Sequence, residues 1–413
     1  MIKLEQSFPR PRLDDLAGQV KIELDKLALT EKDVRGKNIA ITAGSRGINR
    51  IPEIHAAVVA RLKEMGANPF LISAMGSHGG GTPEGQREVL DSLGITPDTV
   101  GCPVICSSAV VKIGVTPTHH VDVYCAKEAV EADGLIVMNR IKCHTAFRAP
   151  RESGLFKMMG IGLGRVPGAE SIHSMGTEVT GQVILELGRI VLKEVNVLGG
   201  IAIVENGYED TEGLYGLNPD EIEAQEALLL QKSNELLPKL PFDDIDLLIV
   251  DEMGKDFSGT CMDTNIIGRW RIAGVAEPLR PRIKRVAVLD LTEASHGNAN
   301  GIGLADFTTR KLVDKINYKA TYLNSITTGF LMRTMLPMIL DSDQEVIDSA
   351  VQSLKAADVD SLRVVRVKNT LHLDEIWVSS NLQRELSGRS DIKVVGAAEP
   401  LRFDAAGNIV KRK

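Results

Sequence analysis

The chain has few cysteines and few aromatic residues, and it contains no long hydrophobic segment. Its five cysteines form no C-x-x-C pair, and an odd number does not suit a disulfide framework, so we expect a reducing cytoplasm. Their scattered spacing also disfavours an iron–sulfur protein. No apolar run approaches the roughly 18–20 residues of a membrane span, and the N-terminal residues do not resemble a signal peptide. We therefore expect no membrane partner.

The charge balance disfavours a nucleic-acid partner. The formal net charge is −7, and aromatic residues make up 4% of the sequence. Such a chain has neither a positive field for phosphate backbones nor many rings on which bases could stack. A length of 413 residues, with 43% hydrophobic and 25% charged residues, is ordinary for a globular protein of two domains.

Strands and helices alternate along the first part of the chain. The predicted strands are 38–43, 69–74, 121–124, 134–138 and 195–204, and the predicted helices are 52–65, 82–93, 127–132, 177–191 and 220–236. This alternation predicts an α/β fold whose mostly parallel sheet is flanked by helices. Ligands gather at the carboxyl ends of such strands, so the loops beginning at Gly44, Gly76 and Asn139 are candidate site loops.

A proline-containing linker at 237–244 divides the chain. We predict a cofactor-binding domain at 1–240 and a second α/β domain at 241–413, with the active site in the cleft between them. In the second domain the predicted strands are 245–250, 286–291 and 362–367, the predicted helices are 304–316, 320–327 and 344–356, and a hairpin is expected at 401–410.

The stretch Ile141–His173 concentrates chemically capable side chains among glycines and prolines. It holds His144, Lys157 and His173, and His78 lies upstream in a Gly-Ser-His-Gly-Gly-Gly loop. Apolar neighbours would lower the pKa of Lys157 and free its amine for covalent chemistry; the structural alternative is a lysine whose ammonium reaches solvent. Each histidine could equally be a structural loop residue.

Other catalytic motifs are absent or incomplete. A serine hydrolase needs a G-x-S-x-G elbow, and neither AGSRG nor MGSHG provides one. The run Gly160–Gly168 misses the dinucleotide pattern G-x-G-x-x-G, although its backbone could still cradle a phosphate. Cys143 could be a nucleophile, but a buried free cysteine is the more frequent case. No tight spacing of zinc ligands is found.

The order of these elements resembles the nickel-dependent lactate racemase family. That family has a D-x-T-R loop, then G-x-H, P-H, S-G-G-x-K and a final histidine. This chain has, in the same order, Ala43–Arg46, Gly76–His78, Cys143-His144, Ser153–Lys157 and His173. The separations of 66 residues from His78 to His144 and of 16 from Lys157 to His173 are also similar.

The resemblance implies a cofactor, a nickel-pincer nucleotide (pyridinium-3,5-bisthiocarboxylic acid mononucleotide with nickel). Lys157 would hold it covalently and His173 would bind the nickel, while Gly44, Ser45, Arg46 and Gly154 would complete the cofactor site. Cofactor-synthesis proteins would be transient partners, and the sequence leaves open whether recombinant protein from a host without them carries the cofactor.

The resemblance also implies a racemase or epimerase of 2-hydroxy acids, with His78 and His144 as the acid/base pair. Arg46 would bind an anionic group. Apart from the resemblance, Lys255 and His296 lie in polar, glycine-rich loops at strand ends of the second domain and are candidates for substrate contacts; solvated loops are the alternative. Ala43 stands where the family has an acidic residue, Leu155-Phe156 replace the second glycine and its neighbour, and the family's Tyr-Gln-x-x-Lys element is not found. We therefore expect a 2-hydroxy acid larger than lactate.

A non-catalytic nucleotide- or metal-binding protein of the same fold is the alternative. Two acid/base histidines favour the enzyme, because holding a ligand requires neither. The sequence leaves the oligomeric state open, a homo-oligomer included.

Overall fold

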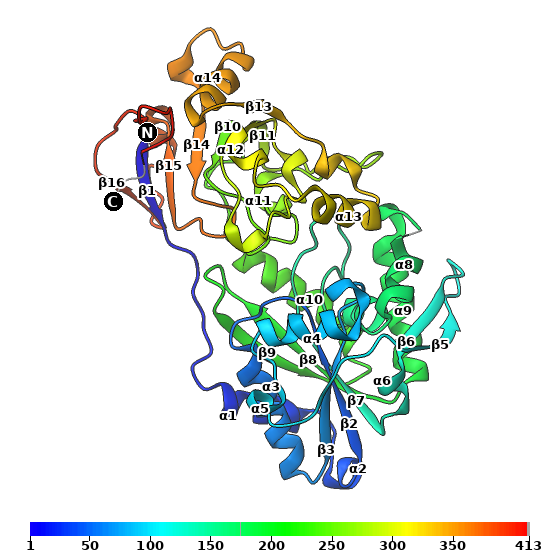
Figure 1. Ribbon diagram of the computed structural model, residues 1–413. Helices are drawn as coiled ribbons and strands as arrows, with labels where there is room; N and C mark the ends of the chain where they lie inside the picture. Colours follow the sequence, from blue (N-terminus) through cyan, green and yellow to red (C-terminus); the bar gives the residue numbers. More distant parts are fainter. Residues whose placement is uncertain (174, 411–413) are drawn as a thin grey trace. The chain divides into compact units, whose positions relative to one another are not determined.

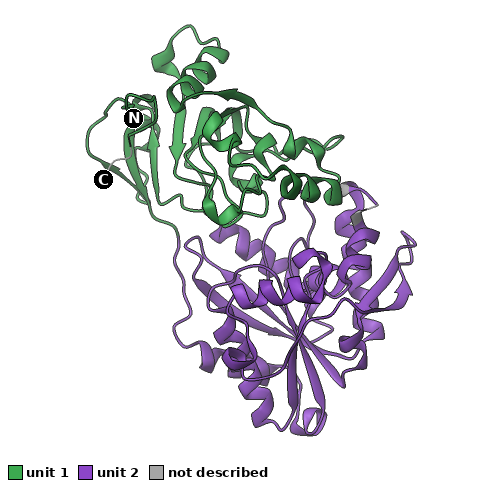
Figure 2. Ribbon diagram, in the orientation of Figure 1, with its two compact units in different colours: residues 1–8, 238–413 green, residues 9–237 purple. Residues whose placement is uncertain are grey.

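The structure is a computed structural model that describes residues 1–173 and 175–410. The chain divides into two compact units: unit 2 is Pro9–Leu237, and unit 1 combines Met1–Phe8 with Pro238–Lys413 (Figure 2). The first residues belong to unit 1 because β1 (Ile2–Gln6) pairs antiparallel with strands from the far end of the chain. The sequence predicts a first domain that begins at residue 1, because the order of the elements along the chain gives no sign that residues 2–6 pair with strands near the C-terminus.

Unit 2 is built on a mostly parallel sheet with the strand order β4-β3-β2-β7-β8-β9 (Figure 1). Its strands are β2 (Asn38–Ala43), β3 (Asn68–Ser73), β4 (Val104–Ile105), β7 (Gly134–Arg140), β8 (Val197–Glu205) and β9 (Thr211–Leu217). Neighbours are parallel except β8 and β9, which are antiparallel. The predicted α/β fold is confirmed for this unit.

Helices cover both faces of this sheet, because successive strand residues point to opposite faces. Ile39 and Ile41 of β2 pack in a core that includes α1 and α3, whereas Ala40 packs in the core that includes α7, α9 and α10. The helices of unit 2 are α1 (Leu16–Lys26), α2 (Glu31–Val34), α3 (Ile51–Glu64), α4 (Pro83–Ser92), α5 (Pro97–Val100), α6 (Lys127–Glu131), α7 (Leu155–Lys157), α8 (Arg165–His173), α9 (Thr177–Glu194) and α10 (Ile222–Leu236). A separate hairpin joins β5 (Val110–Val115) to β6 (Asp122–Ala126).

Unit 1 contains a mixed sheet with the order β13-β12-β11-β10-β14-β15-β1-β16. The part from β13 to β14 is parallel, and the part from β14 to β16 is antiparallel. The strands besides β1 are β10 (Asp244–Val250), β11 (Arg282–Val288), β12 (Phe307–Thr309), β13 (Met338–Leu340), β14 (Val364–Val367), β15 (Glu375–Val378) and β16 (Ile392–Val395), and the helices are α11 (Thr264–Ile267), α12 (Arg310–Val313), α13 (Tyr318–Thr328) and α14 (Asp343–Ser353).

The prediction of a helix at 304–316 is wrong. Residues 307–309 form β12, which is buried and pairs in parallel with β11 on one side and β13 on the other; the short helix α12 follows. Strand pairing on both sides overrides the local helical spacing of apolar residues. The predicted hairpin near the C-terminus is present as an antiparallel bridge between Phe403 and Ile409. Within the described residues, no helix is long and apolar enough to cross a membrane.

Candidate functional site

Two of the predicted site loops meet at the carboxyl edge of the unit 2 sheet. The loop with Gly44, Ser45 and Arg46 follows β2, and the loop with His78 follows β3, its parallel neighbour. The Ser45 hydroxyl is hydrogen-bonded to Nδ1 of the exposed His78 imidazole. The structure therefore joins the first two elements of the predicted site.

The glycine-rich segment around Lys157 packs against both loops. The backbone N–H of Gly76 donates to the carbonyl oxygen of Gly162 at 3.2 Å. A Cβ atom at Gly44 would come within 3.2 Å of Cε of Met158, the residue after Lys157. The β2, β3 and Lys157 segments thus lie together, as their predicted common site requires.

Lys157 is the last residue of the short α7 turn and is half-buried. Within the described part of the chain, its amine has no hydrogen-bond or ion-pair partner. Burial, and to a smaller extent the positive charge of Arg46, lower the pKa of Lys157 to about 8. About a tenth of this amine is therefore neutral and nucleophilic at pH 7, against less than about a thousandth for an ordinary lysine.

The α7 turn is held from two sides. The Asn139 side chain, at the end of β7, donates from Nδ2 to the Gly154 carbonyl oxygen at 2.8 Å. From α10, Oε2 of Glu226 accepts the Phe156 N–H at 3.0 Å. Gly154 is required here, because a Cβ atom would lie 2.6 Å from Oε1 of Glu226.

Sequence reasoning missed Glu226, which is buried at 1% exposure. Burial raises the pKa of Glu226 to about 7, although the N–H groups of Phe156 and Leu155 and the charge of Arg151 act in the opposite direction. The available signal was a carboxylate at helical spacing between the buried residues Ile222 and Leu230.

His144 lies in the loop that follows β7 and is half-buried. Its Nδ1 accepts the Ala146 N–H at 3.2 Å, so the neutral ring carries its proton on Nε2. The His144 and Phe147 rings lie 4.4 Å apart between centroids. These contacts orient the imidazole within its own loop, and its pairing with His78 stays a prediction.

A second carboxylate that sequence reasoning missed supports the His144 loop. Glu152 is 3% exposed, and its carboxylate accepts the His144 N–H at 2.6 Å and the Ala149 N–H at 3.2 Å. Burial raises the pKa of Glu152, while these N–H groups and the Arg148 charge lower it.

The predicted nickel ligand is His173, and the structure gives only its backbone position. His173 ends α8, but its side chain lies outside the described residues. Among the side chains that the structure describes, no group of three or more His, Cys, Asp or Glu residues could hold a metal ion. Cys143 is buried and free of disulfide bonds.

The two predicted substrate residues of unit 1 lie in adjoining loops. The Lys255 N–H donates to Oγ of Ser295 at 2.9 Å, next to His296. The Lys255 ammonium donates to the Gly259 carbonyl oxygen at 2.7 Å and to Oδ1 of Asn324 at 2.9 Å. His296 is exposed. The two loops are thus brought together, and their role in substrate binding stays a prediction.

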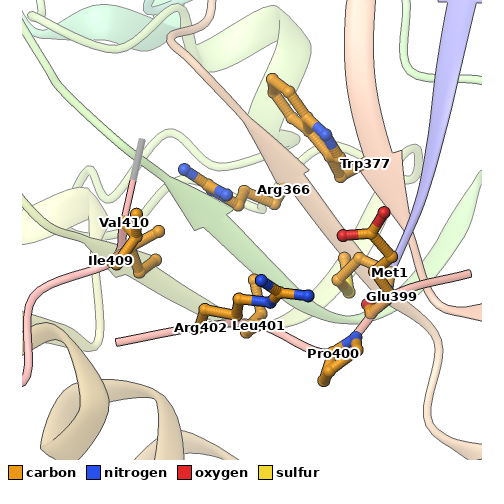
Figure 3. Close-up of a pocket in the computed structure, with 9 residues that line it drawn as sticks. All are labelled: Met1, Arg366, Trp377, Glu399, Pro400, Leu401, Arg402, Ile409 and Val410. Atoms are coloured by element: carbon orange, nitrogen blue, oxygen red, sulfur yellow. Dashed lines mark hydrogen bonds between the residues drawn. The ribbon is translucent and has the colours of Figure 1, made fainter. Parts of the chain in front are cut away.

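A pocket in unit 1 contains none of the predicted site residues (Figure 3). Arg366 and Trp377 form one side of it, and residues 399–402 and 409–410 line much of the remainder. The Arg366 guanidinium forms two hydrogen bonds with Asp251, of 2.7 and 2.8 Å, and lies 5.1 Å from the Trp377 ring centroid. These contacts hold β10, β14 and β15 together, so Arg366 has a structural role there.

Comparisons with known proteins agree with the fold. A family described as a domain of unknown function (DUF362) matches residues 38–218. The lactate racemase apoprotein from Thermoanaerobacterium thermosaccharolyticum is similar at 12% identity and a TM-score of 0.52, covering 90% of this chain and 98% of that one. A structural-genomics protein from Thermotoga maritima is similar at 11% identity and a TM-score of 0.50, covering 68% of this chain and 71% of that one. The comparison with curated proteins finds no match. The sequence resemblance is thus confirmed in three dimensions, and the chain has the fold of lactate racemase.

Proposed function

We propose that this protein is a racemase or epimerase of a 2-hydroxy acid that uses a nickel-pincer nucleotide. The observation that carries the proposal is the Lys157 amine, which has no partner among the described residues, has a pKa of about 8, and lies in the segment that packs against the Ser45–His78 loops. The lactate racemase fold supports it.

The described residues fit such a cofactor. A neutral amine suits the covalent attachment of one cofactor arm to Lys157, and Gly154 keeps the preceding backbone free of side-chain bulk. The planar guanidinium of Arg46 suits a phosphate or carboxylate. The role of nickel ligand falls to His173, whose side chain lies outside the described residues; imidazole is a suitable ligand for nickel. When bound, the nickel-pincer nucleotide supplies a hydride acceptor, which protein side chains do not provide.

The two histidines would move the hydroxyl proton of the substrate. Nδ1 of His78 is hydrogen-bonded to Ser45 and Nδ1 of His144 accepts the Ala146 N–H, and these contacts orient the two rings. One imidazole removes the proton from the 2-hydroxyl of one enantiomer, and the other serves the opposite enantiomer. Imidazole is suited to reversible proton transfer near neutral pH.

The test is racemisation of a panel of single-enantiomer 2-hydroxy acids, followed by chiral chromatography. The enzyme is made with cofactor-synthesis proteins. We expect His78→Ala and His144→Ala to lower turnover by about 10²–10⁴-fold while the nickel content stays unchanged. His372→Ala, at an exposed histidine of unit 1, is the control and should retain turnover. Unchanged turnover in both site variants would contradict the mechanism.

A further inference from the structure

We propose that Glu226 is a positioning residue that seats the α7 turn and thereby presents the Lys157 amine for covalent attachment. The inference rests on the proposed function for the identity of what is attached. The placement of the amine itself can be tested without any cofactor.

The hydrogen-bond partner of Glu226 is the residue next to Lys157 in the chain. One carboxylate oxygen of Glu226 accepts the Phe156 N–H, one residue before Lys157, and the other lies 2.6 Å from the position that a Cβ atom of Gly154 would take. The α7 turn contains only Leu155, Phe156 and Lys157. A displacement of the Phe156 backbone must therefore move Lys157 as well.

A buried carboxylate lowers the stability of the folded protein if its only role is to fill space. Glu226 is 1% exposed, and its Oε1 has no hydrogen-bond partner within the described residues. Burying an unpaired polar oxygen costs free energy, and an apolar side chain of similar volume would avoid that cost. What an apolar side chain cannot do is accept the Phe156 N–H.

Other charged groups around the turn do not replace Glu226. Arg151 donates from Nε to the Glu223 carbonyl oxygen at 2.6 Å, and its guanidinium lies 5.8 Å from the Phe156 ring centroid. Glu223, one turn earlier on α10, forms an ion pair with Arg189 at 2.6 Å. These groups clamp the Phe156 ring and α9, whereas Glu226 holds the Phe156 backbone.

The experiment measures the reactivity of the Lys157 amine in cofactor-free protein. The full chain is labelled with a trace of acetic anhydride at pH 6–11, and acetylation of the Lys157 peptide is quantified by mass spectrometry against the exposed Lys239. The midpoint of labelling with pH reports the environment of the amine separately from its accessibility. Glu226→Gln keeps an acceptor oxygen at full reach, whereas Glu226→Asp keeps the charge but shortens the side chain by one methylene. Glu235→Gln, an exposed position on the same helix, is the matched control.

We expect the wild type, Glu226→Gln and Glu235→Gln to share a midpoint near pH 8, and Glu226→Asp to shift it upward by about one unit because a loosened turn lets the ammonium reach water. Circular dichroism checks that all variants are folded. An unshifted midpoint in folded Glu226→Asp would overturn the proposal, as would an equal shift in Glu226→Gln and Glu226→Asp.

A second arm separates this inference from the proposed function. The same proteins are made with cofactor-synthesis proteins and weighed intact. If wild type acquires an adduct, Glu226→Asp should acquire less of it and Glu226→Gln the wild-type amount; equal loading in all of them would count against positioning. If wild type acquires none while the labelling midpoint still shifts in Glu226→Asp, the nickel-pincer assignment fails and the role of Glu226 stands.

Discussion

The hydroxyl of Ser45 is hydrogen-bonded to Nδ1 of His78, although the two residues lie 33 positions apart in the sequence. The contact exists because β2 and β3 are adjacent parallel strands whose carboxyl ends lie at one edge of the sheet. It links the exposed His78 imidazole to the loop that follows β2.

Loss of the Ser45 hydroxyl should therefore reduce turnover without affecting cofactor loading. We expect Ser45→Ala to lower kcat by about 10-fold, because the His78 ring loses this orienting contact, and Ser45→Thr to retain most of it. The measurement is chiral chromatography on loaded enzyme. A kcat for Ser45→Ala equal to that of wild type would show that the contact does not orient a working group.

Glu152 should be needed for the His144 loop. In Glu152→Ala two partly buried N–H groups, those of His144 and Ala149, lose their acceptor, which should cost about 1–3 kcal/mol of unfolding free energy and lower turnover. Glu152→Gln keeps an acceptor oxygen and should lose less of both. Urea unfolding and the racemisation assay provide the two measurements; equal stability of Glu152→Ala and wild type would refute this role.

The loops at the carboxyl edge of the sheet could be predicted from the sequence, but the buried carboxylates that hold these loops could not. The strand predicted at 38–43 matches β2, and the helix predicted at 82–93 begins as expected, with Thr82 accepting the Gly85 N–H. Apolar runs and caps are local signals, and the carboxyl ends of parallel strands then bring the loops together. Glu152 and Glu226 were missed because their partners are backbone N–H groups that come within reach only in the folded chain.

The same limit explains the errors in unit 1. The pairing of β1 with β15 joins residues 370 or more positions apart, such as Lys3 and Trp377. The strand at Phe307–Thr309 exists because β11 and β13 lie on either side of it. Neither partner can be recognised from a local window of sequence.

Replacing the Lys157 amine should stabilise the cofactor-free protein. The folded-state pKa of Lys157 is about 8 against an ordinary 10.5, so between these values the folded state binds fewer protons than the unfolded state and stability rises with pH. Lys157→Met should therefore be more stable than wild type at pH 7, by about 2 kcal/mol after allowance for partial exposure, and the gain should shrink toward pH 10.5. Urea unfolding at both pH values measures this, with Lys239→Met as the exposed control. A gain that does not depend on pH would contradict the burial of the charge.

Glu226 should show the opposite pH dependence. Its folded-state pKa is about 7 against an ordinary 4.5, so the folded state binds more protons between these values and stability falls as pH rises through that window. Glu226→Gln should be more stable than wild type at pH 8, by about 3 kcal/mol, and similar to it at pH 4.5. Thermal unfolding across this range provides the comparison, and Glu235→Gln should show no such trend. A Glu226→Gln variant less stable than wild type at pH 8 would mean that the buried carboxylate is well paired.

The most direct test of the central claim is intact mass with metal analysis on protein made together with cofactor-synthesis proteins. The account predicts a mass increment that is lost in Lys157→Ala, and about one nickel per chain that is lost in His173→Ala. Wild-type protein that carries neither adduct nor nickel, under conditions that load a known lactate racemase, would contradict it and favour a non-catalytic binding protein of the same fold.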